Sequence, residues 1–252
     1  MADATIHAIL LDIEGTTCPV QFVSEVLFPY AAERLEEFLQ AHGREPAVAD
    51  LLHEVEQAWQ QECDPAAKAL RPSPDLDPSP EDDHNALRTV PYLQWLIQTD
   101  RKLPALKELQ GIIWENGYNT GALTGPLYDD VAPALERWSM AGLKLAVYSS
   151  GSVKAQQLLY QHSNAGDLRD FFQHWFDTTV GSKLEPTSYS RICQQLQLQS
   201  ENVLFVSDSL SELEAAEKAG LQVLFSDRAP SASPCTLPNK YVHVHSFSSL
   251  NP

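Results

Sequence analysis

Short apolar runs separated by helical patterns occupy the beginning and the second half of the chain. Residues 8–11 (Ala-Ile-Leu-Leu) are apolar without interruption, which predicts a short strand buried on both faces, as in a parallel sheet. Further strands are predicted at 143–148, 203–206 and 221–225, with a weaker one at 178–181 and a candidate edge strand at 241–244. Apolar residues at helical spacing place helices at 131–141, 153–159, 187–198 and 211–219. Strands that alternate with helices indicate an α/β fold with right-handed βαβ units and a parallel sheet.

Residues 21–123 differ, because their apolar residues follow helical spacing and show no strand pattern. One helix is expected over 23–39, with a kink at Pro29. Further helices are predicted over 51–59, 86–96 and 103–114. The segment 63–85 is rich in proline and aspartate, and it predicts a loop.

The helical stretch interrupts the chain between its first strand and the rest of the sheet. We therefore expect an α/β core made of residues 1–20 and 124–252, and an inserted helical cap made of residues 21–123. An insertion beside the carboxyl edge of a sheet is well placed to act as a lid over that edge. A helical appendage that never moves would give the same pattern.

Polar residues suited to chemistry follow four of the predicted strands. They are Asp12 and Glu14, Ser149 and Ser150, Lys183, and Asp208. Each is ordinary alone, because a serine or aspartate after a strand often caps a helix and a lysine is usually solvated. The carboxyl ends of parallel strands meet at one edge of the sheet, where open α/β sheets bind ligands. Several carboxylates placed together there repel one another unless a cation or a proton neutralises their charge. Mg²⁺ is the natural partner for such oxygen ligands.

Charge and composition narrow the range of partners. The formal net charge is −17, from 34 acidic and 17 basic residues, which argues against nucleic acid or an anionic membrane as a partner. No apolar run approaches the roughly 20 residues of a membrane span, and residues 1–5 lack the features of a signal peptide. A hydrophobic share of 43% is enough for a packed core.

The four cysteines are scattered without metal-type spacing, so we expect reduced thiols in a cytoplasmic protein. They are Cys18, Cys63, Cys193 and Cys235. Cys18 lies close to the first acidic motif, but no histidine is placed by sequence spacing to activate it as a nucleophile.

The order of these residues resembles the haloacid dehalogenase superfamily of phosphatases. The first motif there usually has aspartate at its second acidic position, whereas this chain has Asp12-Ile13-Glu14-Gly15-Thr16-Thr17. Glu14 with a second threonine is similar to one subfamily, the enolase-phosphatases (acireductone synthases) of methionine salvage. The similarity extends over Gly111–Tyr118, Gly121, Leu123, Tyr128–Val131, Pro133, Tyr148–Ser152, Gly181–Lys183, Ser207-Asp208 and Glu212.

The resemblance implies a Rossmann-like core with a helical cap and one bound Mg²⁺ ion per subunit. It implies that 2,3-diketo-5-methylthiopentyl-1-phosphate is enolised to an enol-phosphate. Loss of phosphate then gives the acireductone 1,2-dihydroxy-3-keto-5-methylthiopentene. With this small phosphorylated diketone as the substrate, we expect a cytoplasmic monomer that binds neither nucleic acid nor membrane.

The resemblance also implies roles for the residues at the strand ends. Asp12 is the candidate nucleophile, and Asp12, Asp208 and a group at Glu14 are candidate ligands of Mg²⁺. The family pattern uses the backbone carbonyl at position 14, and whether the Glu14 side chain also binds stays open. Lys183 is expected to balance charge on the phosphoryl oxygens, while Ser149 orients them and Ser150 is the adjacent candidate for substrate contact.

For proton transfer and for substrate contact, the sequence leaves more than one assignment open. Glu14 is a candidate either for the acid that protonates the leaving oxygen or for the base of enolisation. Glu212 lies one helical turn beyond Asp208 and can face the same site. Cap residues Trp114, Glu115 and Tyr118 are candidates for substrate contact, although Trp114 and Tyr118 fit equally well as cap core.

Three other functions are consistent with parts of the pattern. A generic magnesium-dependent phosphatase of small metabolites would act on several sugar phosphates and form no enol intermediate. A carbon–halogen hydrolase of the same fold would work in the presence of chelator. A non-catalytic module of this fold would be inert toward every phosphate ester, but the full set Asp12, Ser149, Lys183 and Asp208 argues against it.

Overall fold

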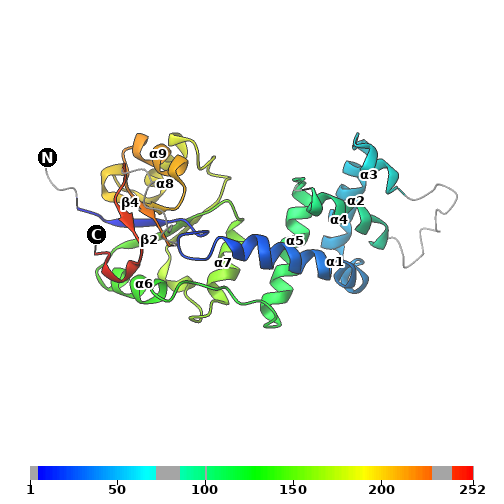
Figure 1. The fold of residues 1–252 in the computed structure, drawn as a ribbon, viewed down its shortest axis with the longest axis horizontal. Coiled ribbons are helices and arrows are strands. Elements are labelled where there is room, and N and C mark those ends of the chain that lie inside the picture. Colours follow the sequence, from blue (N-terminus) through cyan, green and yellow to red (C-terminus); the bar gives the residue numbers. More distant parts are fainter. Residues whose placement is uncertain (1–4, 72–85, 100, 229–239, 252) are drawn as a thin grey trace, which may run out of the picture. The chain divides into compact units, whose positions relative to one another are not determined.

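The computed structural model describes residues 5–71, 86–99, 101–228 and 240–251 (Figure 1). The chain divides into two compact units. An α/β unit contains Met1–Phe22 together with Leu123–Pro252, and a helical unit contains Val23–Ala122.

A parallel sheet of six strands forms the centre of the α/β unit, in the order β3-β2-β1-β4-β5-β6. The strands are β1 (Ala8–Leu11), β2 (Lys144–Tyr148), β3 (His174–Phe176), β4 (Val203–Ser207), β5 (Gln222–Ser226) and β6 (His243–Val244). All four residues of β1 are fully buried, because β2 and β4 flank the strand and helices cover both faces of the sheet. The predicted α/β class is confirmed.

The helices of this unit are α6 (Val131–Met140), α7 (Val153–Gln161), α8 (Pro186–Leu196) and α9 (Leu210–Lys218). Short 3₁₀ segments lie at Arg169–Phe171, Ser200–Asn202 and Phe247–Ser249. Side chains of α8 and α9, such as Ile192 and Leu213, pack with Leu10 and Phe205 on one face of the sheet, and Figure 1 shows α6 and α7 on the other side. Gly142, at φ +80°, provides the left-handed turn that follows α6.

The predicted strand at 178–181 is wrong. β2 pairs with β1 on one side and with β3 on the other, and β3 is three residues long and ends before this segment begins. The Asp177 carboxylate accepts hydrogen bonds from the Thr179 backbone N–H at 2.9 Å and from the Thr179 hydroxyl at 2.5 Å. This local turn competes with strand pairing, as short aspartate side chains commonly do. The expected edge strand near 241–244 is confirmed as β6, which pairs in parallel with β5.

The helical unit contains five α-helices in its described residues, and it has no strand there. They are α1 (Phe28–His42), α2 (Pro46–Gln61), α3 (Pro65–Ala69), α4 (Val90–Gln98) and α5 (Pro104–Asn119). A π-helical turn at Phe22–Leu27 leads into α1, and a 3₁₀ segment at Ala86–Thr89 leads into α4. None of the helices in the described ranges is both long and apolar enough to cross a bilayer.

Two prolines lie in the first turns of helices in this unit. Pro29 lies in the first turn of α1, directly after the π-helical turn at Phe22–Leu27, so the helical stretch predicted over 23–39 changes there from π-helical to α-helical geometry. Pro65 begins α3, with Asp64 capping the helix through the Ala66 N–H, so the loop predicted over 63–85 is wrong at 65–69. Residues 72–85 lie outside the described ranges.

Candidate active site

The loop that follows β1 presents Asp12 at the carboxyl edge of the sheet. Asp12 donates its backbone N–H to Val206 at 3.0 Å, and its side chain is buried. The backbone N–H groups of Thr16, Thr17 and Cys18 all point at the Ile13 carbonyl, at 2.9–3.1 Å. The chain therefore turns sharply directly after Asp12 and carries Glu14 at the bend.

Gly15 brings this loop against the end of β4. Its φ of +68° is unfavourable for other residues, and a Cβ atom there would lie 2.0 Å from Oδ2 of Asp208. Because only glycine permits this approach, the Asp208 carboxylate packs directly on the loop that begins with Asp12. The two predicted aspartates therefore belong to one buried edge of the sheet.

Lys183 reaches the same place from the loop between β3 and α8. Its ammonium group lies 2.5 Å from Asp12 Oδ1 and 2.7 Å from Glu212 Oε2, and the residue is buried. Hydroxyl groups hold its loop, because Tyr189 donates to the Lys183 carbonyl at 2.8 Å and Tyr148 donates to the Gly181 carbonyl at 3.0 Å. Lys183 is thus fixed between two carboxylates even though no strand forms at 178–181.

Sequence reasoning missed the direct partners of Asp12 and Lys183 on β4 and α9. The Ser207 hydroxyl lies 3.2 Å from Asp12 Oδ2 and 3.1 Å from Glu212 Oε2, and it accepts the Ser209 N–H. Glu212, which the sequence analysis placed as able to face the same site as Asp208, also pairs directly with Lys183. The available signal was the run Ser207-Asp208 at a strand end with Glu212 four residues later.

Ser149 and Ser150 occupy different environments. Ser149 is buried at the end of β2, where its hydroxyl accepts the Gly151 N–H at 3.2 Å. Ser149 also acts on the Glu14 carboxyl, whose pKa it lowers slightly against the larger rise caused by burial and the Asp12 charge. Ser150 is exposed, and Ser152 caps α7 through the Ala155 N–H. The structure therefore brings Ser149 to the acidic loop and leaves Ser150 at the surface beside it.

Negative charge accumulates at this edge. Burial raises the pKa of Asp208 to about 6, and the charge of Asp12 contributes to the rise. Burial and the Asp12 charge also raise the pKa of Glu14 and of Glu212, the latter despite its contact with Lys183. Burial alone would lower the pKa of Lys183, but the charges of Asp12 and Glu212 raise it above its usual value. The Lys183 amine therefore stays protonated and positively charged. The one ammonium group contacts two of these four carboxyl groups, Asp12 and Glu212, and does not balance their combined charge, so the site favours additional positive charge.

The oxygen donors at this edge fit a magnesium ion. Among the described residues, no three His, Cys, Asp or Glu side chains already converge as a complete metal site. Mg²⁺, however, commonly binds through only one or two carboxylates and completes its shell with water and phosphate. Asp208 and Asp12 interact strongly enough to shift the pKa of Asp208, and a backbone carbonyl at Glu14 would add a third oxygen. The chemistry of the donor set therefore suits the ion.

Cys18 and two aromatic residues of the helical unit were further candidates from the sequence. Burial, with the Glu14 charge, raises the pKa of the Cys18 thiol to about 12, so Cys18 stays protonated and is unsuited to act as a nucleophile. Trp114 and Tyr118, both on α5, are buried, and the Trp114 indole donates to the Leu27 carbonyl of the same unit at 2.7 Å. Cys235 lies outside the described residues.

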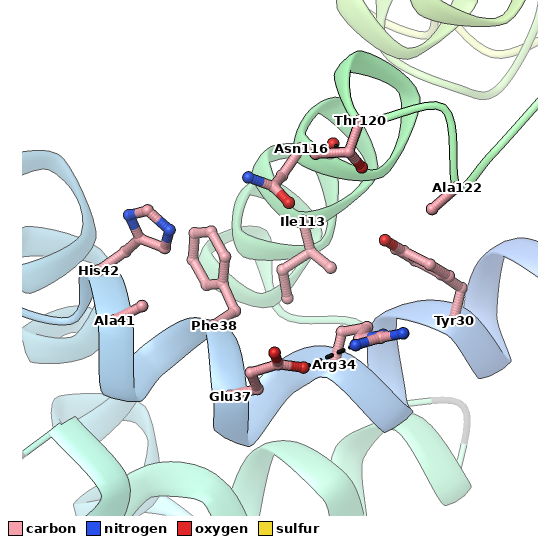
Figure 2. A pocket seen from close by; sticks show the side chains of 10 residues that line it. All are labelled: Tyr30, Arg34, Glu37, Phe38, Ala41, His42, Ile113, Asn116, Thr120 and Ala122. Carbon is pink, nitrogen blue, oxygen red and sulfur yellow. Dashed lines mark hydrogen bonds and ion pairs between the residues drawn. The ribbon is translucent and has the colours of Figure 1, made fainter.

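Figure 2 shows a pocket of about 280 Å³ within the helical unit, between α1 and α5. Its lining includes Tyr30, Arg34, Glu37 and Phe38 from α1, and Ile113 and Asn116 from α5. Arg34 and Glu37 are exposed and paired at 2.7 Å, so solvent screens their charges. None of the residues predicted to act in catalysis lines this pocket.

Comparison with known proteins agrees with the arrangement at the sheet edge. The sequence pattern of the haloacid dehalogenase-like hydrolases matches residues 6–220. Enolase-phosphatase E1 of Synechococcus sp. (strain RCC307) is 50% identical over 249 residues, which cover 98% of this chain and 95% of that protein. The chain belongs to the enolase-phosphatase E1 family.

Two further relatives of the enolase-phosphatase chain cover nearly its full length. Enolase-phosphatase E1 of Synechococcus elongatus is 47% identical, over 98% of both proteins. The crystal structure of the UTR4 protein from Saccharomyces cerevisiae is 30% identical, with a TM-score of 0.74 over 98% of this chain and all of that one. The family and the fold therefore extend across both units of the chain.

Proposed function

We propose that this protein is the enolase-phosphatase of methionine salvage. It converts 2,3-diketo-5-methylthiopentyl-1-phosphate through an enol-phosphate to the acireductone and free phosphate. The observation that carries the proposal is the contact of the Lys183 ammonium group with Asp12, on a sheet edge shared with Asp208, in a chain that is 50% identical to a curated enolase-phosphatase.

Asp12 is the nucleophile in this mechanism. Lys183 holds one of its carboxylate oxygens and Ser207 lies beside the other, so the side chain has a fixed orientation. Attack of a carboxylate oxygen on phosphorus forms an aspartyl-phosphate and breaks the bond to the enol oxygen. Water then attacks the same phosphorus, which releases inorganic phosphate and restores the Asp12 carboxylate.

Lys183 and Ser149 orient the phosphoryl group. The buried ammonium group of Lys183 offers positive charge and N–H donors directly beside Asp12, where the phosphoryl oxygens must lie during transfer. Ser149 and the exposed Ser150 supply donors on the neighbouring strand end. One Mg²⁺ held by Asp12, Asp208 and the carbonyl or carboxyl of Glu14 would supply the positive charge that lets a carboxylate approach a phosphate dianion.

Glu14 is the proton-transfer residue of the proposal. Enolisation moves a proton from carbon, and phosphate release needs a proton on the departing oxygen. Burial and the Asp12 charge raise the pKa of Glu14, so this carboxyl group holds a proton more readily than a solvated glutamate. A carboxyl group with a raised pKa suits either enolisation or protonation of the departing oxygen. Accumulation of the enol-phosphate in the Glu14→Gln variant would separate the two steps.

The helical unit has the role of a cap over the phosphatase core in this proposal. Residues 1–20 with 124–252 would then do the chemistry, while residues 21–123 exclude water and contact the methylthio end of the substrate. The proposal further includes a cytoplasmic monomer that acts on a free small molecule.

Incubation with the diketo-phosphate in Mg²⁺ tests the function. We expect enol absorbance to rise before inorganic phosphate is released, and excess chelator to stop phosphate release. Release of phosphate from several sugar phosphates without any enol signal would instead identify a generic phosphatase. A protein inert toward all of these esters in Mg²⁺ would contradict the proposal.

A further inference from the structure

Two side chains at the end of β5 hold the backbone of the catalytic loop. The Ser226 hydroxyl donates to the Gly15 carbonyl at 2.9 Å, and the Arg228 Nε–H donates to the Thr16 carbonyl at 2.8 Å. Both carbonyls lie within the loop that carries Asp12 and Glu14. Neither Ser226 nor Arg228 belongs to the motifs that the sequence analysis singled out.

Arg228 is itself rigidly held. Its Nη1 lies 2.6 Å from Asp130 Oδ2, and its guanidinium carbon lies over the rings of Tyr128 and Phe247, at 4.7 and 4.0 Å from their centroids. Only 5% of the side chain is exposed. Its Nη2 is buried and has no hydrogen-bond partner in the described part of the chain, but the contacts at Nε, at Nη1 and with the two rings leave the group little freedom to move.

Asp130 links Arg228 to the C-terminal segment. The Ser246 hydroxyl donates to Asp130 Oδ2 at 2.7 Å, and the Phe247 backbone N–H donates to the same oxygen at 2.5 Å. A chain of contacts therefore runs from residues 246–247 through Asp130 and Arg228 to the Thr16 carbonyl. We call Ser226, Arg228 and Asp130 the loop brace.

The position of the brace gives it a consequence for the site. In the sheet, β4 lies between β1 and β5, so the loop after β1 must cross the end of β4 to reach Ser226. Asp208 follows β4, and Gly15 packs directly on its carboxylate. The Gly15 and Thr16 carbonyls that the brace holds therefore belong to the part of the loop that packs on the Asp208 carboxylate.

We propose that Ser226 and Arg228 are positioning residues that set the spacing between the Asp12 loop and Asp208, and with it the affinity of the site for Mg²⁺. The inference rests on the proposed function in one respect, namely that Asp12 and Asp208 share the ion. Thr17 is anchored separately, by its hydroxyl 2.8 Å from the Tyr160 hydroxyl. Loss of the brace therefore loosens the Gly15–Thr16 part of the loop while the unit stays folded.

The test compares Ser226→Ala, Arg228→Met and Arg228→Lys with wild type. Ser163→Ala is the matched control, because the Ser163 hydroxyl is also buried and donates to a backbone carbonyl, that of Gly166 at 2.6 Å, away from the loop. Calorimetric titration of the metal-free chain with Mg²⁺ gives the dissociation constant. Hydrogen exchange of the amides in residues 13–18 reports the loop itself, and a thermal melt confirms folding.

Ser226→Ala is expected to weaken Mg²⁺ binding about fivefold, the change that corresponds to one hydrogen bond of about 1 kcal/mol. Its loop amides should exchange faster. Arg228→Met should weaken binding further, and Arg228→Lys should restore part of the loss because an ammonium group replaces one of the two contacts. Ser163→Ala should match wild type in both measurements.

Unchanged Mg²⁺ affinity and loop exchange in a folded Ser226→Ala protein would overturn the proposal, even if its melting temperature falls, because a purely stabilising role predicts that result. Equal weakening by Ser163→Ala would overturn it as well. If wild type releases no phosphate from the diketo-phosphate, the proposed function fails. Loop exchange then decides the brace independently of catalysis.

Discussion

The two units of this protein differ in how many polar or charged side chains they bury. Among the described residues, the buried polar or charged side chains lie in the α/β unit, with two exceptions in the helical unit, Thr89 and Gln110. Lys183 and Asp12 are buried at the edge of the sheet, whereas Arg34 and Glu37 of the helical unit pair in solvent. Burying charge is costly, so a protein that does so at one sheet edge indicates where its chemistry takes place.

The interior of the helical unit is built from apolar and aromatic packing. Trp59 and Tyr92 stack with their ring centroids 5.0 Å apart and nearly parallel, and Tyr92 stacks in turn with Trp95. In the charged pair Arg101 and Glu62, the arginine side chain is half-exposed and the Glu62 side chain is 11% exposed. The interior of the helical unit is therefore mainly apolar and aromatic, whereas the α/β unit buries charged side chains at its sheet edge.

Asp12→Asn should have the largest effect, because it removes the nucleophile from the charged unit. An amide has nearly the same shape but cannot attack phosphorus, so phosphate release should fall at least about 1,000-fold, or about 4 kcal/mol in barrier. Steady-state phosphate release measures the loss, and far-ultraviolet circular dichroism checks the fold. Activity within about tenfold of wild type would remove Asp12 from this role.

The pH dependence of stability should expose the charge at the sheet edge. Because the folded pKa of Asp208 is raised from 3.8 to about 6, this group favours the folded state at pH below about 4, and that contribution is lost as the pH rises through about 6. The free energy of unfolding of metal-free protein should fall by up to about 3 kcal/mol over this window. Urea unfolding between pH 4 and 7.5 would measure it.

Asp208→Asn is the matched control for this experiment, and it should flatten the pH dependence. Mg²⁺ should do the same in wild type, because the ion stabilises the ionised carboxyl groups. If the free energy of unfolding of metal-free wild type rises between pH 4 and 7.5, the carboxyl groups at the sheet edge do not repel one another.

Lys183→Met should lower phosphate release about 100-fold, because it removes a donor aimed at the transferring group. Lys183→Arg should recover only part of the rate, since the guanidinium group differs in shape and donor geometry. Lys218→Met removes an exposed lysine of α9 and should be silent. If Lys183→Met turns over substrate like wild type, Lys183 does not bind the phosphoryl group.

Trp114→Phe should have the smallest effect and should act on stability alone. It leaves the buried Leu27 carbonyl without the indole donor, which costs about 1–2 kcal/mol in the free energy of unfolding. Because Trp114 is buried on α5 of the helical unit, kcat on the diketo-phosphate should stay within about twofold of wild type. A large loss of kcat with unchanged stability would make Trp114 part of the chemistry.

The difference between the units also explains what could be predicted from the sequence. Uninterrupted apolar runs such as Ala8–Leu11 and Val203–Val206 are strong signals, because a strand buried on both faces has no polar position. The short strand β3 was not predicted, because the three residues His-Trp-Phe are too few to show an alternation of apolar and polar positions. The turn at Asp177 depends on local hydrogen bonds. Pro29 lies where a π-helical turn passes into α1, a change of geometry that the spacing of apolar residues does not encode.

The candidate site was predictable only as a set of strand ends. Parallel strands bring Asp12, Ser149 and Asp208 to one edge whatever the details of the loops. The bridging contacts of Lys183 with Glu212, and of Ser226 with the Gly15 carbonyl, join residues far apart in the sequence. No periodicity encodes such contacts, because they depend on how loops cross the sheet edge.

The central claim is that the phosphoryl group is transferred to Asp12, and rapid-quench mass spectrometry during turnover of the diketo-phosphate tests it most directly. The account predicts a phosphoryl group on the peptide that contains Asp12, which forms and decays within one turnover and is absent from Asp12→Asn. A phosphoryl group on a different peptide, or phosphate release with no protein-bound phosphate, would contradict the account.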